Sequence, residues 1–295
     1  MKKTVFTGAG VAIVTPMHED GSVNYEVFSR LLEEQIAGGT DAVIACGTTG
    51  ESAALSHQEH VEVLDYAVRR VNKRVPVIAG TGSNDTAYAL ELSLEAQKLG
   101  ADALLMVTPY YNKTSQTGLV RHFTYVADRV QLPIILYNVP SRTGCSIKPE
   151  TFLELSKHPN IVAVKEASGD ISAVADIAAL CGEDLQIYSG NDDQIVPVLS
   201  LGGKGVISVL SNILPRETHD ICELFFKGDT EGSRRMMLKY LDLIHALFSD
   251  VNPIPVKEAM NLMGMQAGPC RLPLVEMSES GKKHLAGILK QYGLL

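Results

Sequence analysis

The sequence predicts a (β/α)8 barrel followed by a smaller helical segment, and three observations support this fold class. Eight short apolar runs recur every roughly 20–35 residues, as a repeating strand–loop–helix–loop unit would produce. The runs are continuously apolar rather than alternating, which is typical of parallel strands covered on both faces. The chain has 295 residues, and a barrel of roughly 250 residues leaves room for an addition.

The eight predicted strands are β-branched runs bounded by Gly, Pro and polar residues. They are "GVAIVTP" (10–16), "DAVIACG" (41–47), "VPVIAGTG" (75–82), "ADALLMVTP" (101–109), "LPIILYNVP" (132–140), "NIVAVKEAS" (160–168), "LQIYSGND" (185–192) and "KGVISVL" (204–210). A doubly wound open sheet is the alternative. Its Gly-x-Gly-x-x-Gly signature fails, because "GAGVAI" (8–13) and "GTGSND" (80–85) both lack the third glycine.

The segments between the strands have the end signals of helices. Residues 24–39 open on an asparagine cap and close on glycine. Residues 56–71 open on Ser56 with Glu59 three positions on, which forms a capping box. Residues 84–100 run from an Asn/Asp cap to a terminal glycine.

Only helices are predicted from about residue 215 onward. Residues 230–250 carry an apolar stripe at helical spacing, formed by Met237, Leu241, Ile244, Leu247 and Phe248. We therefore expect a barrel that carries the active site (1–225) and a C-terminal helical subdomain packed on it (226–295).

Composition and charge exclude several classes of protein. Hydrophobic residues make up 45% and charged residues 20% of the chain, near the norms of globular proteins. The net charge of −8 argues against nucleic-acid or anionic-membrane partners, which need a basic face. No run of 18 apolar residues is present for a membrane span. The start "MKKTVFTGAGVAIVTP" is read as a first strand rather than a signal peptide.

Neither a disulfide framework nor a metal site is expected. The five cysteines are odd in number, far apart and without CxxC spacing, which favours a reducing cytoplasm and buried apolar roles. These residues are Cys46, Cys145, Cys181, Cys222 and Cys270. Most histidines fall in predicted helices or connections, namely His57, His60, His122, His158, His219 and His245. The sequence therefore favours a covalent mechanism over metal catalysis.

Reactive side chains gather where the predicted strands end, which is where barrel enzymes place their chemistry. The segments that follow strands 2, 4, 5 and 7 are "GTTGE" (47–51), "TPYYNK" (108–113), "YNVPSRTG" (137–144) and "YSGND" (188–192). Nearby acids have simpler expected roles: Glu166 and Asp170 as caps of the helix after strand 6, and Asp192–Asp193 as the start of the helix after strand 7.

Lys165 ends the sixth predicted strand, directly after an apolar run. Moving an ammonium out of water costs several kcal/mol unless something offsets it. One explanation is a side chain that extends to solvent or pairs with Glu51 or Glu166. The other is that burial favours the neutral amine, which can attack a carbonyl to form an imine.

Three further elements of this rim have a structural and a chemical explanation each. Tyr137 is either a buried tyrosine with a satisfied hydroxyl or a proton shuttle. Thr48 and Thr49 either cap a helix or hold a carboxylate together with backbone N–H groups. Arg142 is either solvated or a bidentate carboxylate ligand. Together on one rim they favour a site for a small anionic carbonyl compound.

Several motifs together resemble the dihydrodipicolinate synthase family. They are "CGTTGE", "TPYYNK", "YNVPSRTG", "VAVKEASGD", "YSGNDD" and "GVISVLSN", with "NPIPVKEAMNLMG" and "RLPL" near the end. The resemblance covers essentially the whole chain. It implies a pyruvate-dependent class I aldolase-type lyase of the N-acetylneuraminate lyase superfamily. Such an enzyme condenses pyruvate with L-aspartate 4-semialdehyde in the diaminopimelate route of lysine biosynthesis.

The resemblance also implies roles for individual residues. Lys165 would form the Schiff base with pyruvate, and Tyr137 would transfer protons in a relay with Thr48 and Tyr111. Tyr111 would reach the neighbouring subunit's site, which implies a homodimer, commonly paired into a homotetramer. The substrate-binding residues would be Thr49 for the pyruvate carboxylate, Gly190 and Ile207 through their main chain, and Arg142 for the semialdehyde carboxylate. No cofactor or metal is implied, and the expected location is the cytoplasm.

Two alternatives stay open. A sugar-acid aldolase shares the Thr-Thr turn, the tyrosine and the lysine, but sialic-acid lyases lack an arginine at the position of Arg142. A catalytically silent barrel could instead bind a small keto acid as a sensor, although the nucleophile, relay and carboxylate ligand are all present.

The resemblance further implies a candidate allosteric pocket for lysine. Its residues would be Ser52, Ala53, His57, His60, Asn84, Tyr88 and Tyr110. Lysine-inhibited members usually have a glutamate where this chain has Tyr88. We therefore expect weak or no inhibition by lysine, because the effector's amino group loses its charge partner.

Overall fold

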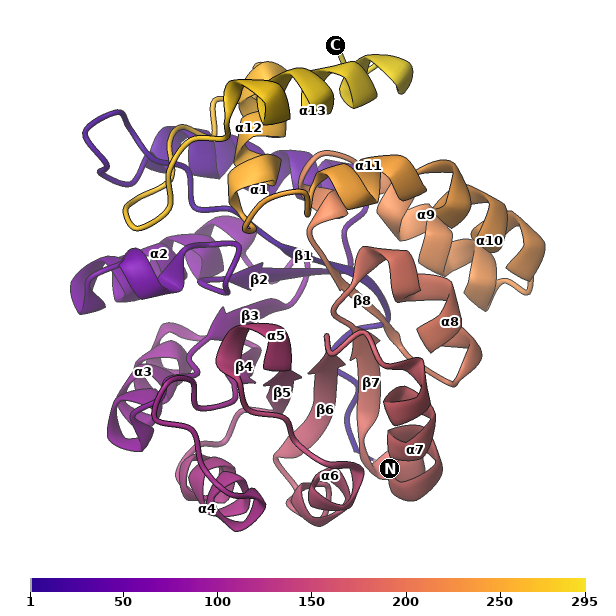
Figure 1. Cartoon of the computed structure of the whole chain (residues 1–295). Coiled ribbons are helices and arrows are strands. Elements are labelled where there is room, and N and C mark those ends of the chain that lie inside the picture. Colours follow the sequence, from indigo (N-terminus) through magenta and orange to yellow (C-terminus); the bar gives the residue numbers. More distant parts are fainter. Residues whose placement is uncertain (1) are drawn as a thin grey trace.

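The computed structural model describes residues 2–295 and contains a closed barrel of eight parallel strands (Figure 1). The strands are β1 (Gly8–Ala12), β2 (Ala42–Ala45), β3 (Val77–Gly80), β4 (Ala103–Val107), β5 (Ile134–Asn138), β6 (Ile161–Glu166), β7 (Gln186–Ser189) and β8 (Gly205–Ser208). Each strand pairs with the next in sequence, and β8 pairs with β1 to close the sheet. The predicted fold class and all eight predicted strands are confirmed.

Helices surround the barrel and continue beyond it (Figure 1). They are α1 (Tyr25–Gly38), α2 (His57–Val71), α3 (Thr86–Leu99), α4 (Gln116–Ala127), α5 (Pro140–Thr143), α6 (Pro149–Leu155), α7 (Ile171–Cys181), α8 (Ile195–Ser200), α9 (Pro215–Phe226), α10 (Thr230–Lys239), α11 (Leu241–Ala246), α12 (Ile254–Leu262) and α13 (Glu279–Gln291). Short 3-10 turns are η1 (Ser52–Ala54), η2 (Gly182–Asp184), η3 (Asp192–Gln194) and η4 (Leu210–Asn212).

The helix ends follow the local signals in the sequence. Asn24 caps α1 by accepting a hydrogen bond from the Val27 N–H, and Gly39 ends this helix in the left-handed conformation. Ser56 and Glu59 form the predicted capping box of α2. Because these signals act within a few residues, they fix where α1 and α2 start.

A stacked aromatic pair fills part of the barrel interior. Phe6 and Tyr188 lie with ring centroids 4.3 Å apart, and the Tyr188 hydroxyl donates to the Phe6 carbonyl at 2.6 Å. Tyr137 and Ile207 belong to the same inner apolar cluster. A larger cluster packs the outer faces of the strands against the helices. The inner apolar cluster therefore packs against the ends of β5 and β8 from inside the barrel.

The C-terminal helices pack on the barrel and on one another. α10 packs on α9, α11 on α13, and α12 on both η4 and α13. The predicted stripe is broken at Tyr240 between α10 and α11, and Phe248 is 42% exposed, so its predicted burial is wrong. Met237, Ile244 and Leu247 are buried as expected. The division at residue 225 stays a prediction.

All five cysteines are free, four of them are buried, and Cys270 is partly exposed. Over residues 2–295, no helix is both long and apolar enough to cross a bilayer.

Candidate active site

Lys165 and Tyr137 lie side by side at the carboxyl ends of neighbouring strands. They are paired in the register of β5 with β6. The Lys165 Nζ lies 4.4 Å from the centroid of the Tyr137 ring, and each residue is only 6% exposed. The lysine therefore neither extends into solvent nor pairs with Glu51 or Glu166, the two carboxylates considered above. A primary amine is held against an aromatic face at the mouth of the barrel.

Glu166 joins the end of β5 to the segment that follows β6 through two hydrogen bonds. Its Oε2 accepts from the Asn138 Nδ2 at 2.8 Å, and its Oε1 accepts from the Ser168 N–H at 2.7 Å. Burial raises the pKa of the Glu166 carboxyl above its usual value, and these hydrogen bonds oppose the shift. Asp170 alone caps α7, so the predicted capping role of Glu166 is wrong.

Asp192 joins the segment after β7 to the segment after β8 through hydrogen bonds. Its Oδ2 accepts from the N–H groups of Val209 and Leu210 at 3.0 and 2.9 Å. Burial raises the pKa of the Asp192 carboxyl, and hydrogen bonds and the charge of Lys165 act in the opposite sense. Asp192 does begin η3, as its position suggested, but its carboxylate ties the end of β7 to the segment after β8.

The Thr48–Thr49 turn follows β2 and is held by close backbone packing. A Cβ on Gly80 would lie 2.1 Å from the Cys46 carbonyl oxygen, so β3 must carry glycine there. Thr48 is partly exposed at the mouth, whereas Thr49 is 2% exposed. The Thr49 Oγ1 accepts a hydrogen bond from the Asn252 Nδ2 at 3.0 Å.

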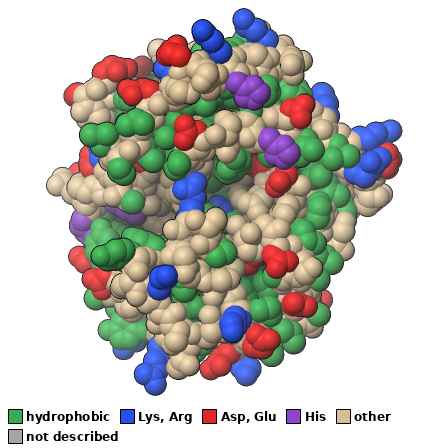
Figure 2. Space-filling view, in the orientation of Figure 1, with side chains coloured by type: hydrophobic (Ala, Val, Ile, Leu, Met, Phe, Trp, Pro, Cys, Tyr) green, Lys and Arg blue, Asp and Glu red, His purple; other side chains and the backbone are tan. Residues whose placement is uncertain are grey.

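Arg142 lies in α5, which follows β5 and sits over the middle of the barrel in Figure 1. Its Nη2 donates to the backbone carbonyl of Asn252 at 3.3 Å. Thr49 and Arg142 thus both contact Asn252, a residue that the sequence reasoning missed. Figure 2 shows a hollow near the middle of this face, with Lys or Arg side chains beside it.

Gly190 follows β7 and Ile207 belongs to β8, the two strands that come after β6 around the barrel. The Gly190 N–H is already used, since it donates to the Glu166 carbonyl at 2.7 Å. A Cβ at Gly190 would lie 2.5 Å from the Ala167 Cβ, so only glycine fits without displacement. Ile207 lies in β8 and is fully buried. Any main-chain contact from Gly190 to a ligand would therefore come from its carbonyl.

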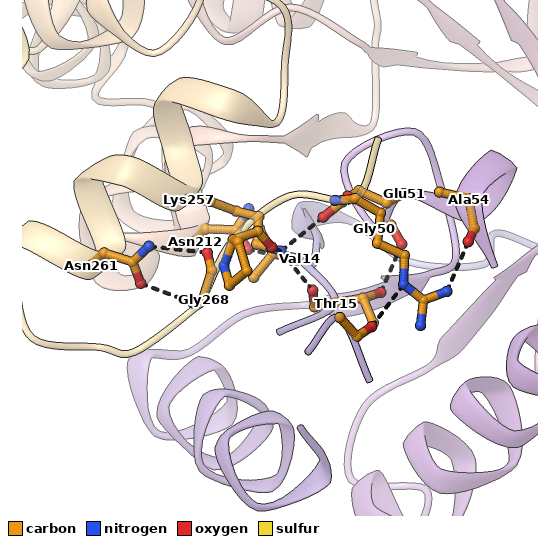
Figure 3. A network of polar contacts seen from close by, with 12 residues as sticks. Val14, Thr15, Gly50, Glu51, Ala54, Asn212, Lys257, Asn261 and Gly268 are labelled. Atoms are coloured by element: carbon orange, nitrogen blue, oxygen red, sulfur yellow. Dashed lines mark hydrogen bonds and ion pairs between the residues drawn. The ribbon is translucent and has the colours of Figure 1, made fainter. Parts of the chain in front are cut away.

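A buried ion pair supports the Thr48–Thr49 turn from the C-terminal helices (Figure 3). The Lys257 Nζ of α12 lies 2.8 Å from the Glu51 Oε1 and also donates to the carbonyls of Thr15 and Pro269. The other Glu51 oxygen accepts from the Arg271 N–H at 2.9 Å. Sequence reasoning missed this network, although "GTTGE", "NPIPVKEAM" and "RLPL" contain its members.

Tyr111 is not part of this cluster within one chain. Its side chain is 90% exposed, and its backbone has a φ of +67°. Among the described residues, no hydrogen bond joins Tyr111 to Tyr137 or Thr48. The predicted relay is therefore not closed by this chain alone.

The residues of the candidate allosteric pocket are only partly brought together. The rings of His57 and Tyr88 lie 5.8 Å apart, and the His57 Nε2 lies 4.0 Å from the Glu91 Oε1. His60 is buried, and its Nε2 is 2.8 Å from the Gly80 carbonyl. Burial lowers the His60 pKa. The remaining members show graded exposure: Ser52 and Asn84 are partly buried, and Ala53 and Tyr110 are exposed.

One side-chain group has the composition of a metal site, and it lies elsewhere. His219, Asp220 and Glu223 of α9 place one ligand atom each within 4.8 Å of one another. The His219 Nδ1 lies 2.9 Å from the Asp41 Oδ2. Asp41 precedes β2, so this group sits at the amino ends of the strands, opposite the rim that carries Lys165.

The chain is similar to known proteins over nearly its whole length. Residues 5–292 match the model of the Dihydrodipicolinate synthetase family. The chain is 59% identical over 292 residues to the 4-hydroxy-tetrahydrodipicolinate synthase of Lachnoclostridium phytofermentans, covering 99% of each chain. It is 55% identical over 295 residues to the enzyme of that name from Acetivibrio thermocellus, covering 100% of both.

Solved structures agree with this assignment. The dihydrodipicolinate synthase of Thermotoga maritima superposes with a TM-score of 0.96 at 42% identity, over 99% of this chain and 100% of that one. The chloride-inhibited dihydrodipicolinate synthase of Acinetobacter baumannii, complexed with pyruvate, gives 0.97 at 41% identity over the same shares. On the matched length, the barrel and the site motifs, this chain belongs to the dihydrodipicolinate synthetase family.

Proposed function

We propose that this protein is a 4-hydroxy-tetrahydrodipicolinate synthase, a lyase that condenses pyruvate with L-aspartate 4-semialdehyde. The observation that carries the proposal is the placement of Lys165, whose amine is buried beside Tyr137 at the mouth of the barrel. The full-length relatives that bear this name support it. The reaction would serve the diaminopimelate route to lysine.

The neutral Lys165 amine would attack the carbonyl carbon of pyruvate, and loss of water would give an imine. The imine withdraws electrons, so a methyl proton leaves and an enamine forms. The enamine carbon then attacks the aldehyde carbon of the second substrate, whose oxygen takes up a proton. Finally the substrate amine attacks the imine carbon and expels Lys165, which closes the ring. The imine is the electron sink, so the proposed mechanism uses no cofactor.

The other rim residues would bind and orient the two substrates. Thr49 would hold the pyruvate carboxylate. Gly190 and Ile207 would contribute main-chain contacts to the bound pyruvate, and the contact from Gly190 would be its carbonyl, which can accept from a protonated imine but cannot bind a carboxylate. Arg142 is a cation at the edge of the same mouth and would bind the carboxylate of the semialdehyde. Tyr137 lies next to the amine and would carry protons to and from the imine, assisted by Thr48.

Tyr111 would complete the relay in the neighbouring subunit of a homodimer. The support is its exposure, because a tyrosine 90% exposed on a loop with positive φ is available to another chain. We propose that dimers pair further into a homotetramer, in the cytoplasm. A related solved structure is described as a monomeric dihydrodipicolinate synthase variant, with a TM-score of 0.96 at 42% identity.

The decisive experiment is reductive trapping of the imine. The protein is incubated with pyruvate, reduced with borohydride, and analysed by intact mass and peptide mapping, with Lys165→Ala as the control. A single pyruvate adduct on Lys165, together with turnover of the semialdehyde, is the expected result. Absence of an adduct in folded protein would overturn the Schiff-base mechanism and favour a silent keto-acid barrel. An adduct with turnover of a sialic acid instead would identify a sugar-acid aldolase.

A further inference from the structure

Asn252 lies between the two groups that the proposed function assigns to substrate carboxylates. It precedes α12, in the C-terminal segment, and is 5% exposed. Its side-chain Nδ2 donates to the Thr49 Oγ1 at 3.0 Å, across 203 positions of sequence. Its backbone carbonyl accepts from the Arg142 Nη2 at 3.3 Å. Asn252, which lies outside the barrel strands, therefore contacts both Thr49 and Arg142.

The amide of Asn252 is only half satisfied. Its Oδ1 is buried and has no hydrogen-bond partner in the part of the chain that the structure describes. Asn212, a buried asparagine after β8 (Figure 3), bonds through both ends: Nδ2 to the Ala12 and Val209 carbonyls, and Oδ1 from the Val14 N–H. Leaving a buried polar atom unsatisfied is costly, so it is uncommon in a purely structural asparagine.

The direction of the hydrogen bond to Thr49 matters chemically. A hydroxyl group has one proton to donate and lone pairs that accept. Because the Thr49 oxygen accepts from Asn252, its own proton stays available to a ligand. A carboxylate can only accept hydrogen bonds. A threonine that binds a carboxylate must therefore present its proton, and the contact with Asn252 favours that state.

We propose that Asn252 is a positioning residue that sets the Thr49 hydroxyl as a hydrogen-bond donor to the carboxylate of the keto-acid substrate. This inference rests on the proposed function, in which pyruvate forms an imine with Lys165. Asn252 would act on the keto-acid substrate through Thr49 alone. The Arg142 contact uses the backbone carbonyl, which every side-chain substitution retains. The C-terminal helical segment thus contributes to the affinity for the first substrate.

The main measurement is the pyruvate concentration that gives half-maximal imine trapping by borohydride. In Asn252→Ala this concentration should rise about 5- to 10-fold, as expected for the loss of one orienting hydrogen bond. The KM for the semialdehyde should change much less, because the carbonyl that contacts Arg142 remains. A general structural defect would change both values together.

Asn252→Asp gives a second, isosteric readout. A carboxylate accepts the Thr49 proton and turns it away from the ligand, whereas a protonated carboxyl group can still donate. The pyruvate requirement of this variant, relative to wild type, should therefore grow as the pH rises from about 5 to about 8. Asn252→Ala should show no such growth relative to wild type.

Controls separate positioning from folding. Asn261→Ala changes an exposed asparagine of the same segment, whose amide bonds to both the N–H and the carbonyl of Gly268. It should retain the wild-type pyruvate requirement. In a Thr49→Val background, Asn252→Ala should add little, because the hydroxyl it orients is gone.

Two outcomes would overturn the inference about Asn252. One is an equal pyruvate requirement in wild type and Asn252→Ala, and the other is additive effects of the Thr49 and Asn252 substitutions. In both cases, imine trapping in the wild type would still support the proposed function. Absence of trapping in the wild type would overturn the proposed function and this inference with it.

Discussion

Lys257 of α12 and Glu51 of the turn after β2 form an ion pair of 2.8 Å, with side chains 2% and 1% exposed. The pair joins the C-terminal helices to the turn that carries Thr48 and Thr49. Each charge is accompanied by further hydrogen bonds: Lys257 donates to two carbonyls, and Glu51 accepts from the Arg271 N–H. Two buried charges are therefore almost fully compensated, and neither is easily removed alone.

We expect Lys257→Met to destabilise the fold strongly, because Glu51 would be left buried without its countercharge. The free energy of unfolding should fall by about 3–5 kcal/mol, measured by urea denaturation. Lys227→Met is the matched control, because the Lys227 Nζ also lies 2.8 Å from a glutamate, Glu223, but its side chain is 66% exposed. That control should cost less than about 1 kcal/mol. Similar losses in both variants would contradict the importance of burial.

We also expect acid to weaken the fold through His122. Burial lowers the pKa of His122 to about 4, with Asp85 acting in the opposite sense, and its Nδ1 lies 2.9 Å from the Thr86 hydroxyl. The folded state binds this proton more weakly than the unfolded chain does. The stability that His122 contributes is therefore present above pH 6.5 and is lost as the pH falls toward 4.

Linkage gives a loss of about 2 kcal/mol between pH 7 and pH 5 from this one group. Urea denaturation at both values should show the loss in wild type and a smaller one in His122→Gln. The buried His60, whose pKa is also lowered, adds a contribution of the same sign that remains in the variant. His284→Gln, at an exposed histidine, controls for loss of an imidazole. An identical pH dependence in wild type and His122→Gln would refute the assignment.

The elements that local sequence determines were predictable. A strand buried on both faces must be continuously apolar, so all eight strands could be placed from their side chains. The caps of α1 and α2 depend on residues three positions apart, so they were predictable too. Lys165 stood out because a cation ended such a strand, and its burial beside Tyr137 could be anticipated from strand order.

Contacts between distant segments were not predictable. Asn252 and Thr49 are 203 positions apart, and no local pattern distinguishes Asn252 from an ordinary loop asparagine. Glu166 shows the opposite failure: its position before a helix suggested a cap, but the parallel register places Asn138 opposite it. Phe248 does not share the burial of Ile244 because α11 ends at Ala246, so Phe248 lies beyond the helix.

We expect free lysine to inhibit this enzyme weakly or not at all. The family resemblance implies a glutamate in lysine-inhibited members where this chain has Tyr88, and a phenol offers no charge to an ammonium group. Steady-state rates in millimolar lysine should equal the rate without it. Tyr88→Glu should introduce inhibition, because it supplies a carboxylate to the effector's ammonium group. Strong inhibition of the wild type at low lysine would refute this prediction.

Tyr111→Phe tests whether the relay is shared between subunits. Tyr111 is 90% exposed in the single chain, so removing its hydroxyl should leave the stability of the monomer fold unchanged. The kcat should fall by about 100-fold or more if the hydroxyl carries protons in the reaction. Lys165→Ala should abolish imine formation entirely.

Mixing the two inactive variants under conditions of subunit exchange gives the sharper result. In a mixed dimer, one site has an intact Lys165 from one chain and an intact Tyr111 from the other, whereas the second site lacks both. With random pairing, half of the dimers are mixed and half of their sites are complete, so activity should recover to about a quarter of wild type. Mixing without recovery, while exchange is verified by mass spectrometry of the intact dimers, would place Tyr111 outside the neighbour's site.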